Sequence, residues 1–235
     1  GDGRALLGLV EEVLASAKPG EVLDAATMLT VVQRRAPIYD KAQDGHYNLI
    51  SALHKTIRGS DPDAALYYFA RMLDAGEDPL FLARRLIRMA SEDIGLADPQ
   101  ALTLAVAARD AFQMLGSPEG ELSLAQVVVY LALAPKSNAV YTAYKGAMSL
   151  AKATGSPMPP MVILNAPTKL MKGEGYGEGY IYDHDTPEAF SGQEYFPETL
   201  GRQKFYQPVE RGFERDLKKR IDYFERLRAT RREQD

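Results

Sequence analysis

The residues able to do chemistry are sparse in this chain of 235 residues. The most glycine-rich stretch, GEGYGEGY at 173–180, lacks the lysine and the G-x-x-x-x-G-K-[ST] spacing with which a phosphate-binding loop holds a nucleotide. Its two glutamates would also repel phosphate. The chain contains no apolar strand ending in Asp-Glu that could carry a magnesium-binding acid. We therefore predict a turn-rich loop at 173–180 and no ATP hydrolysis by this chain alone.

The histidines and serines indicate little metal or nucleophilic chemistry. His46 and His54 lie eight residues apart with no third ligand placed beside them, so a capping or surface role is favoured. His184, in the string Tyr-Asp-His-Asp, could bind a cation, join a small hydrogen-bond cluster or serve an independent enzyme. Ser137 follows a lysine without the spacing of an activated pair, and we predict it as a helix N-cap. The sequence predicts no metal site and no cofactor in this chain.

Basic residues are the candidates for nucleic-acid binding, and they lie on two predicted helices: Lys55, Arg58, Arg84, Arg85 and Arg88. Acidic residues at 77, 78, 92 and 93 flank the arginines, which favours ion pairing. DNA binding stays open as the alternative, because a few phosphate contacts suffice for weak, salt-sensitive binding.

Aromatic residues on the predicted helices exceed what one small core commonly needs: Tyr67, Tyr68, Phe81, Tyr130, Tyr141 and Tyr144. Aromatic side chains favour both cores and interfaces. We expect most of them in the core, and we hypothesise that a subset contacts other subunits.

Helical periodicity runs through most of the chain and predicts an all-α fold. The predicted helices cover 21–34, 46–57, 62–75, 79–94, 99–115, 122–134, 137–153 and 208–232. Pro62 suits a first helical turn, Ala75-Gly76 a stop, and Asp98-Pro99 a new start. The run VVVYLALA could form a strand, but its length and helical setting favour a helix. We expect Val140, Tyr144, Ala147 and Leu150-Ala151 to face inward.

Two stretches interrupt the helices. Residues 35–44 read as a linker, with a turn at Asp44-Gly45, and we place a domain boundary there, between 1–38 and 39–235. Residues 155–207 are rich in glycine, proline and aromatic residues, which predicts a long ordered loop pinned by aromatic burial, with one helical turn at 167–172.

Composition limits the functional class. A hydrophobic content of 46% allows a sizeable core, and the lack of cysteine excludes disulfides and thiolate metal sites. No apolar run approaches the ~20 residues that cross a bilayer, so we expect a cytoplasmic protein without membrane contact. With a net charge of −4, any nucleic-acid contact must come from a local patch.

Several long strings resemble one family. GSDPDAALYYFARML, AGEDPLFLARRLIRMASEDIGLADPQA, APKSNAVYTAY and NAPTKLMK are similar to the C-terminal region of the replication-associated recombination ATPases of the RarA (MgsA) type, relatives of Werner-helicase-interacting protein. The first residues, GDGRALLGLVEEV, resemble the AAA+ lid helix with the sensor-2 arginine, so the resemblance assigns that role to Arg4.

The resemblance implies a lid remnant followed by a helical oligomerisation domain like the collar of clamp-loader subunits. It implies a homotetrameric parent that binds ATP and magnesium, hydrolyses ATP in a DNA-dependent way, and works at stalled replication forks with DNA and single-strand-binding protein. Of these implied roles, only subunit assembly is also supported by the residues of this chain, because its predicted helices have a surplus of apolar faces. The rival hypothesis is a DNA-binding or partner-docking module whose surface is the arginine helices and residues 176–206.

Overall fold

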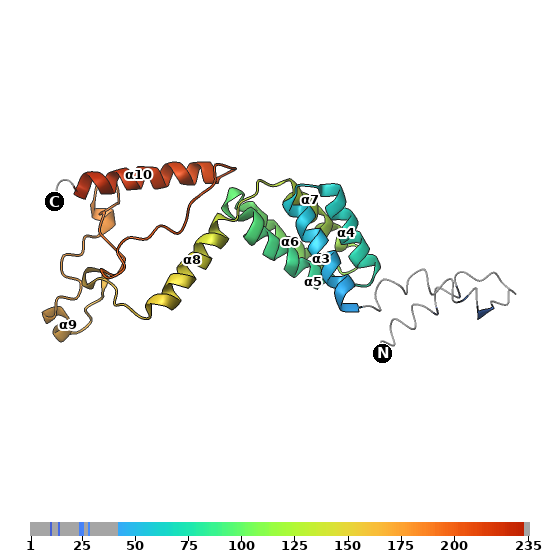
Figure 1. Cartoon of the computed structure of the whole chain (residues 1–235), viewed down its shortest axis with the longest axis horizontal. Helices are drawn as coiled ribbons and strands as arrows, with labels where there is room; N and C mark the ends of the chain where they lie inside the picture. Colours follow the sequence, from blue (N-terminus) through green and yellow to red (C-terminus); the bar gives the residue numbers. More distant parts are fainter. Residues whose placement is uncertain (1–9, 11–13, 15–23, 26–27, 29–41, 233–235) are drawn as a thin grey trace. The chain divides into compact units, whose positions relative to one another are not determined.

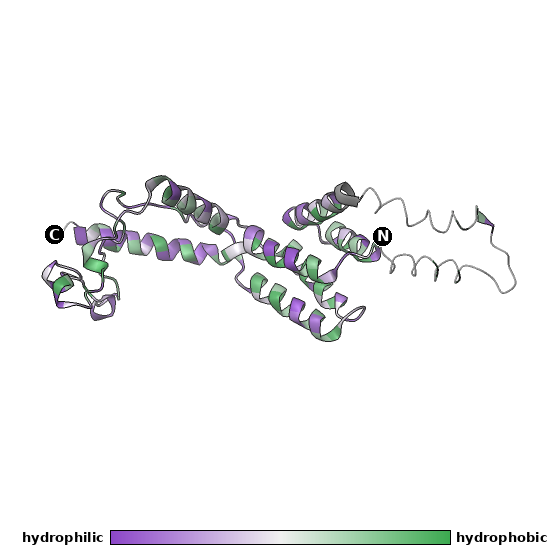
Figure 2. Cartoon of the chain, turned by 90° about the horizontal axis from the view of Figure 1, so that it is seen from below, coloured by the Kyte–Doolittle hydropathy of each residue, from purple (hydrophilic) through white to green (hydrophobic). Residues whose placement is uncertain are grey.

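The computed structural model describes residues 42–232 and positions 10, 14, 24, 25 and 28. Every regular element among these residues is a helix and none is a strand, which confirms the all-α prediction (Figure 1). Hydrophilic and hydrophobic residues are interspersed along the helices (Figure 2), as expected for helices that bury one face. Arg4, most of the predicted helix at 21–34 and the predicted boundary at 38/39 lie outside the described residues, and the boundary stays a prediction.

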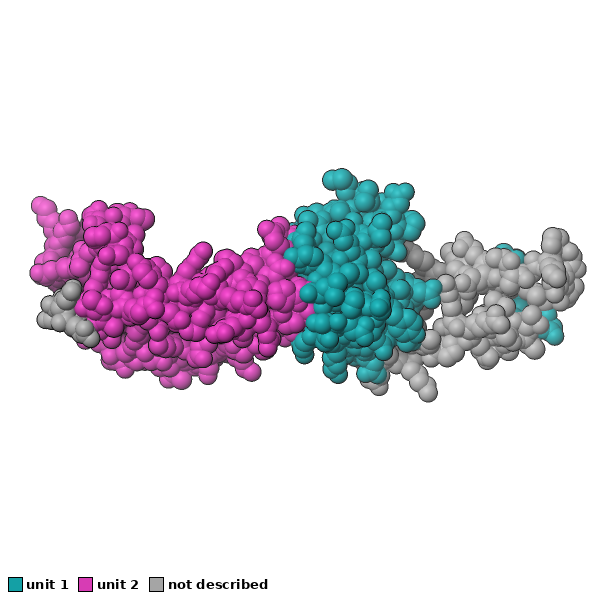
Figure 3. All heavy atoms as spheres, turned by 90° about the horizontal axis from the view of Figure 1, so that it is seen from above, with its two compact units in different colours: residues 1–87, 104–133 teal, residues 88–103, 134–235 magenta. Residues whose placement is uncertain are grey.

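The described residues divide into two compact units (Figure 3). The first unit takes residues up to 87 together with 104–133, and the second takes 88–103 together with the residues from 134 onward. The chain therefore leaves the first unit within one helix and returns to it within the next. Each unit is described separately below.

Three helices form the core of the first unit: α3 (Ala42–Arg58), α4 (Pro62–Asp74) and α7 (Glu121–Leu133) contact one another. Their buried side chains include Leu53, Ile57, Ala65, Phe69, Met72, Leu124, Val128 and Leu131. The boundaries of α4 follow the prediction. The Asp61 carboxylate accepts a hydrogen bond from the Ala64 N–H at 2.9 Å, Pro62 opens the first turn, and Gly76 follows the helix with a φ of +86°.

The start of α3 corrects the predicted linker. The helix begins at Ala42 and continues through Asp44-Gly45, where a turn was predicted. A glycine inside a helix costs only ~1 kcal/mol relative to alanine. The apolar face of α3, with Leu49, Leu53 and Ile57 buried, offsets that cost.

The run VVVYLALA is helical, as predicted. Leu124, Val127, Val128 and Leu131 are buried in α7, so tertiary contacts outweigh the strand preference of branched residues. The helix begins at Glu121, one residue before the predicted start at 122.

The segment from α5 to α6 changes helical geometry. α5 (Pro79–Met89) is followed by a π-helical turn, η1 (Ala90–Ile94), a 3₁₀ turn, η2 (Gly95–Ala97), and α6 (Gln100–Leu115). The Asp98 carboxylate accepts from the Gln100 N–H at 3.1 Å, which confirms the predicted helix start behind Asp98-Pro99. Gly95 has a φ of +53°, and a Cβ atom there would lie 3.1 Å from the Ser137 carbonyl oxygen. The chain that leads into α8 passes so close to residue 95 that glycine is needed there.

Helix α8 (Ala139–Thr154) corrects two predictions. Its N-cap is Asn138, not Ser137; the Asn138 side chain makes no capping hydrogen bond, and the Ser137 hydroxyl accepts from the Ala139 N–H at 3.2 Å. Its predicted inward face is largely exposed: Val140 is 38% and Tyr144 65% exposed, and only Ala139 is buried along the helix. The neighbours of α8 include η1 and η2, Arg88, which stacks over Tyr141, and Phe205, whose ring lies 3.5 Å from where a Cβ of Gly146 would be.

Residues 155–207 form the predicted irregular region. It contains the turns η3 (Met161–Ile163) and η4 (Asp183–Asp185) and one short helix, α9 (Lys169–Gly173), close to the predicted turn at 167–172. The Thr168 hydroxyl caps α9 by accepting from the Met171 N–H. Aromatic contacts hold the region, with ring centroids 5.1 Å apart for Phe190 and Phe224 and 6.3 Å apart for Phe196 and Phe205.

A buried carboxylate joins the elements of the second unit. Glu214 is 0% exposed and begins α10 (Glu214–Arg232). It accepts hydrogen bonds from the Ser137 hydroxyl at 2.8 Å, the Tyr206 hydroxyl at 3.0 Å and the Val209 N–H at 2.8 Å. We call these four residues the Glu214 cluster. It connects the chain before α8 with the segment that leads into α10.

The start of α10 differs from the predicted one at Pro208. Gly212, with a φ of +50°, turns the chain just before the helix, and a Cβ there would lie 2.0 Å from the Ala97 carbonyl oxygen. The Phe213 N–H donates to that same oxygen at 2.8 Å. Gly212 and Phe213 therefore contact η2, and the helix begins after them at Glu214.

Replacing Phe69 with alanine should lower the free energy of unfolding by ~3–5 kcal/mol, because a large buried ring leaves a cavity. Tyr67→Ala is the matched control, since Tyr67 lies on the same helix and is 57% exposed. Urea unfolding followed by circular dichroism measures both. Equal losses in the two variants would contradict this placement of the core.

Glu214→Gln should destabilise the second unit by ~1–3 kcal/mol, because the amide nitrogen cannot accept the hydrogen bonds that one carboxylate oxygen now accepts. Glu210→Gln, an exposed change of the same type, is the control. Urea unfolding monitored by tyrosine fluorescence compares them, and an unchanged midpoint for Glu214→Gln would rule out this role.

Burial, followed by the hydrogen bond to Glu214, raises the pKa of Tyr206 above its ordinary 10.0. The folded state therefore holds this proton more tightly than the unfolded chain. Its stabilisation is complete below pH 10.0 and is lost as the pH rises toward the higher folded pKa. Tyr206→Phe should flatten the fall of the urea midpoint above pH 10.0. The same fall in wild type and variant would refute it.

Candidate functional site

The glycine-rich string at 173–180 is a chain of turns, as predicted. Gly175, Gly177 and Gly179 have φ angles of +84°, +73° and +76°, a region that suits glycine. The Tyr176 N–H donates to the Met171 carbonyl oxygen at 3.1 Å, which folds the string back on α9.

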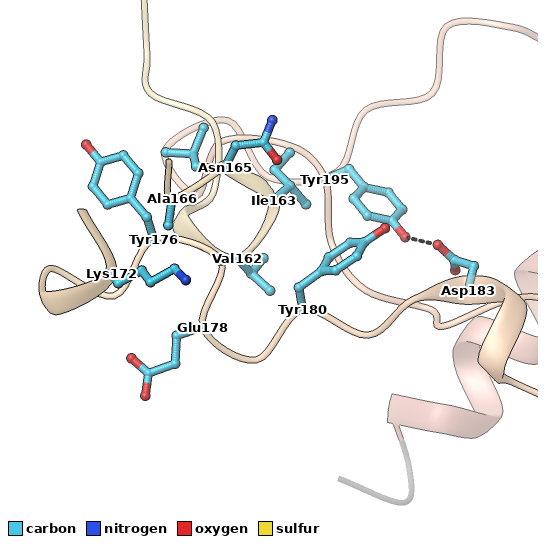
Figure 4. Close-up of a pocket in the computed structure, with 12 residues that line it drawn as sticks. Val162, Ile163, Asn165, Ala166, Lys172, Tyr176, Glu178, Tyr180, Asp183 and Tyr195 are labelled. Atoms are coloured by element: carbon cyan, nitrogen blue, oxygen red, sulfur yellow. Dashed lines mark hydrogen bonds between the residues drawn. The ribbon is translucent and has the colours of Figure 1, made fainter. Parts of the chain in front are cut away.

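An aromatic cavity of about 1110 Å³ lies beside this string (Figure 4). Its lining combines tyrosines with polar groups, including Tyr176, Tyr180, Tyr195, Asn165, Lys172 and Asp183. All of them come from residues 162–195, within the irregular region. The cavity thus overlaps residues 176–206, the surface that the rival hypothesis assigned to partner docking, and extends beyond it to residues 162–172.

Asp183 serves local structure. Its carboxylate accepts from the Ser191 N–H at 2.6 Å and from the Tyr195 hydroxyl at 3.3 Å, and Figure 4 shows the tyrosine pointing at it. The hydrogen bonds from Ser191 hold the pKa of Asp183 below its usual range. Of the alternatives left open for the Tyr-Asp-His-Asp string, the structure shows the hydrogen-bond cluster. Among the described residues, no three histidine or acidic side chains gather as metal ligands.

Three of the predicted basic residues lie together. Lys55 and Arg58 of α3 and Arg85 of α5 line one small hollow of about 220 Å³, with Tyr47, Ile50, Ser51 and His54. We call it the basic hollow. His54 was assigned a surface or capping role from the sequence, yet its spacing of four residues from Arg58 places both on one helix face. No sequence signal places Arg85 beside them, because it comes from another helix.

The other two predicted arginines are ion-paired. Arg84 lies 3.5 Å from Asp78 and stacks over Phe81 at 5.9 Å from the ring centroid. Arg88 lies 2.6 Å from Glu92, which raises the pKa of its guanidinium, and it stacks over Tyr141 at 5.8 Å. The ion pairing that the flanking acids favoured is present at both.

The predicted interface aromatics differ in exposure. Tyr67, Tyr141 and Tyr144 are exposed, whereas Tyr68, Phe81 and Tyr130 are half-buried. Two of the exposed residues lie on α8 together with Val140 and Met148, which are 38% and 40% exposed. We call Val140, Tyr141, Tyr144 and Met148 the α8 stripe. At 3.6 residues per turn these four positions fall within an arc of about 100°, so the stripe is continuous.

No helix in the part of the chain that the structure describes is long and apolar enough to cross a membrane.

Comparison with known proteins matches both parts of the chain. A family model described as MgsA AAA+ ATPase C terminal matches residues 59–225, and one described as AAA C-terminal domain matches residues 1–58. Replication-associated recombination protein A of Coxiella burnetii is 47% identical over 231 residues, which cover 97% of this chain and 52% of that protein. The protein of the same name from Escherichia coli K12 is 46% identical over 219 residues, covering 91% and 49%.

A eukaryotic relative matches as well. ATPase WRNIP1 of Dictyostelium discoideum is 45% identical over 191 residues, which cover 79% of this chain and 21% of that protein. The chain thus spans about half the length of the bacterial relatives named above and less of the eukaryotic one. These matches confirm the resemblance that the sequence strings indicated, and the chain belongs to the MgsA AAA+ ATPase C-terminal family.

Proposed function

We propose that this chain assembles an AAA+ ATPase into a homotetramer and that the α8 stripe is a principal contact between its copies. The exposure of the stripe is the observation that carries the proposal. The family supplies the ATPase setting, and the resemblance described above supplies the number of subunits.

The two exposed sides of α8 differ in polarity. One side is the α8 stripe, which is aliphatic and aromatic and contains no charged side chain. Another side presents Thr142, Lys145 and Ser149, all exposed and polar. A helix that faced only solvent would have no reason to separate these residue types, whereas a helix between its own unit and a second protein would.

The residue types of the stripe suit a protein partner. Tyrosine and methionine are enriched in the buried centre of protein interfaces, where charged residues are depleted. Tyrosine also loses little side-chain freedom for the area that it buries. A second copy of the chain offers the same uncharged stripe, so symmetric or neighbouring contacts would leave no charge unpaired.

The whole protein would join this region to an ATPase core. The bacterial relatives are named for replication-associated recombination, and the eukaryotic one is named an ATPase. We propose the corresponding role for the whole protein at stalled replication forks. It would bind ATP and magnesium at the core, with Arg4 reaching the nucleotide as the sensor-2 residue. DNA and single-strand-binding protein are its proposed partners.

Tyr144→Glu together with Met148→Glu should convert the assembled form to smaller species, because two charges would have to be buried in the contact. Light scattering over a range of chain concentrations measures the mass, which should be four times that of one chain for the wild type. Interface anchors of this kind cost ≥2 kcal/mol each when lost, so the midpoint of assembly should shift to a clearly higher concentration.

Ser149→Glu is the matched control, since it adds a charge to the polar side of the same helix. It should assemble as the wild type does. A wild-type monomer at every concentration would refute the assembly role. A tetramer that survives the double variant would move the contact away from the α8 stripe.

A further inference from the structure

The last helix of the second unit, α10, has an exposed side that is rich in arginine (the helix is labelled in Figure 1). Arg215, Lys219, Arg220 and Arg226 are exposed there, and Tyr223, which lies between them, is 43% exposed. We call these five residues the α10 basic face. At 3.6 residues per turn the five positions fall within an arc of about 140°, so they form one continuous face.

Lysines, and not these arginines, neutralise the carboxylates of α10. Three of its four carboxylates pair with a lysine, at N–O distances of 3.0, 2.6 and 2.8 Å: Asp216 with Lys219, Asp222 with Lys218, and Glu225 with Lys204. The fourth belongs to Glu214, which is buried and hydrogen-bonded as described above. Each carboxylate of the helix therefore already has a partner.

The exposed arginines have no acidic partner among the residues that the structure describes. No ion pair joins Arg215, Arg220 or Arg226 to a described carboxylate. Arg215 donates through Nε to the Glu210 carbonyl oxygen at 3.0 Å, and Arg220 lies over the Phe213 ring at 5.8 Å from its centroid. Because a guanidinium carries five N–H donors, all three arginines keep donors for an anion.

Tyr223 is held in place among these cations. Its ring meets that of Phe224 edge-on, with the centroids 5.4 Å apart, and Phe224 in turn contacts Phe190, with the centroids 5.1 Å apart. Arg220 and Arg226 are each three residues from Tyr223, so both are its neighbours on the helix surface. A ring that is already held by its neighbours loses little freedom when a flat ligand stacks on it.

Cations around an accessible ring suit a partner that carries both negative charge and flat rings. Single-stranded nucleic acid has a phosphate at every nucleotide, and its bases are free to stack on aromatic side chains. Arg215 and Arg226 are about 16 Å apart along the axis at a rise of ~1.5 Å per residue, so the face can follow several phosphates. We propose that the α10 basic face binds single-stranded nucleic acid, with its arginines on backbone phosphates and one base stacked on Tyr223.

Other anionic partners fit the face less well. An acidic peptide offers carboxylates without requiring a ring beside them, and the bases of a duplex are already stacked on one another. A helix that lies on a membrane inserts a wide apolar side. The aliphatic residues Leu217, Ile221 and Leu227 of α10 are instead half-buried in their own unit. The exposed tyrosine among the arginines thus favours a single strand.

This inference deepens the proposed role of DNA as a partner and rests on it. Light scattering on each variant described below measures its mass, and so separates assembly through the α8 stripe from strand binding. Strand binding that persists unchanged in the variants would refute the α10 basic face and leave DNA as a partner of the chain.

The test is the binding of fluorescein-labelled oligothymidylate by the full chain, measured by fluorescence anisotropy across a salt series. Arg215→Gln and Arg226→Gln should each weaken binding about tenfold, because each removes hydrogen bonds to a charged group. Each should also reduce the steepness of the plot of log affinity against log salt by about 0.7, the value for one phosphate contact on a single strand.

Substitutions at Tyr223 test the stacked base. Tyr223→Ala should weaken binding about tenfold and leave the salt slope unchanged, because it removes stacking but no charge. Tyr223→Phe should bind as the wild type does, since it keeps the ring. Circular dichroism checks folding, and the two exposed arginines carry the test if Tyr223→Ala does not fold.

Lys145→Gln is the matched control for charge. Lys145 is exposed on α8, makes no ion pair with a described residue and lies outside the α10 basic face. The variant removes the same charge as the arginine variants without removing a contact to the strand. It should leave binding within about twofold of the wild type, because salt screens charges that do not touch the strand.

Three results would overturn the proposal. The first is oligothymidylate binding that is undetectable in the wild type, or unchanged in both Arg215→Gln and Arg226→Gln. The second is an equal loss in Lys145→Gln, which would assign the effect to overall charge. The third is a different occupant, seen as tighter, Arg226-dependent binding of labelled duplex DNA, of poly-L-glutamate or of vesicles of anionic lipid.

Discussion

The buried carboxylate of Glu214 is the constraint on which the second unit depends. A carboxylate withdrawn from water must have its oxygens hydrogen-bonded, or it destabilises the fold. The donors that satisfy it, from Ser137, Tyr206 and Val209, come from separate parts of the chain. The first turn of α10 can therefore form only when the segment before α8 and the end of the irregular region are both in place.

This arrangement leaves α8 supported at its beginning and exposed along much of its length. The Ser137 N–H donates to the Asp93 carbonyl oxygen at 2.7 Å, so the chain enters α8 from a fixed point next to η1. Beyond Ala139 no residue of the helix is buried. A firmly placed helix whose uncharged side faces outward is suited to present a contact surface, and this is why we assign assembly to the α8 stripe.

The arginines of α5 differ in whether a nearby carboxylate neutralises their charge. Arg84 and Arg88 each have a carboxylate within reach, and each also covers an aromatic ring, so their charges support local structure. Arg85, between them in sequence, turns toward α3 and finds other cations there. Neighbouring residues of one type thus have different roles because successive side chains of a helix point in different directions.

The sequence by itself determined the helices, many of their ends and the family. Asp61-Pro62, Gly76 and Asp98-Pro99 act on the backbone next to them, so their effect needs no distant contact. It also indicated the ion pairs at Arg84 and Arg88, whose partners lie within six residues. Only the tertiary structure decided that α10 begins at Glu214, that Ser137 donates to that carboxylate, that Tyr144 faces outward and that Arg85 joins Lys55. Each of these depends on residues distant in the chain, because periodicity shows that a helix has an apolar face but not which neighbour covers it.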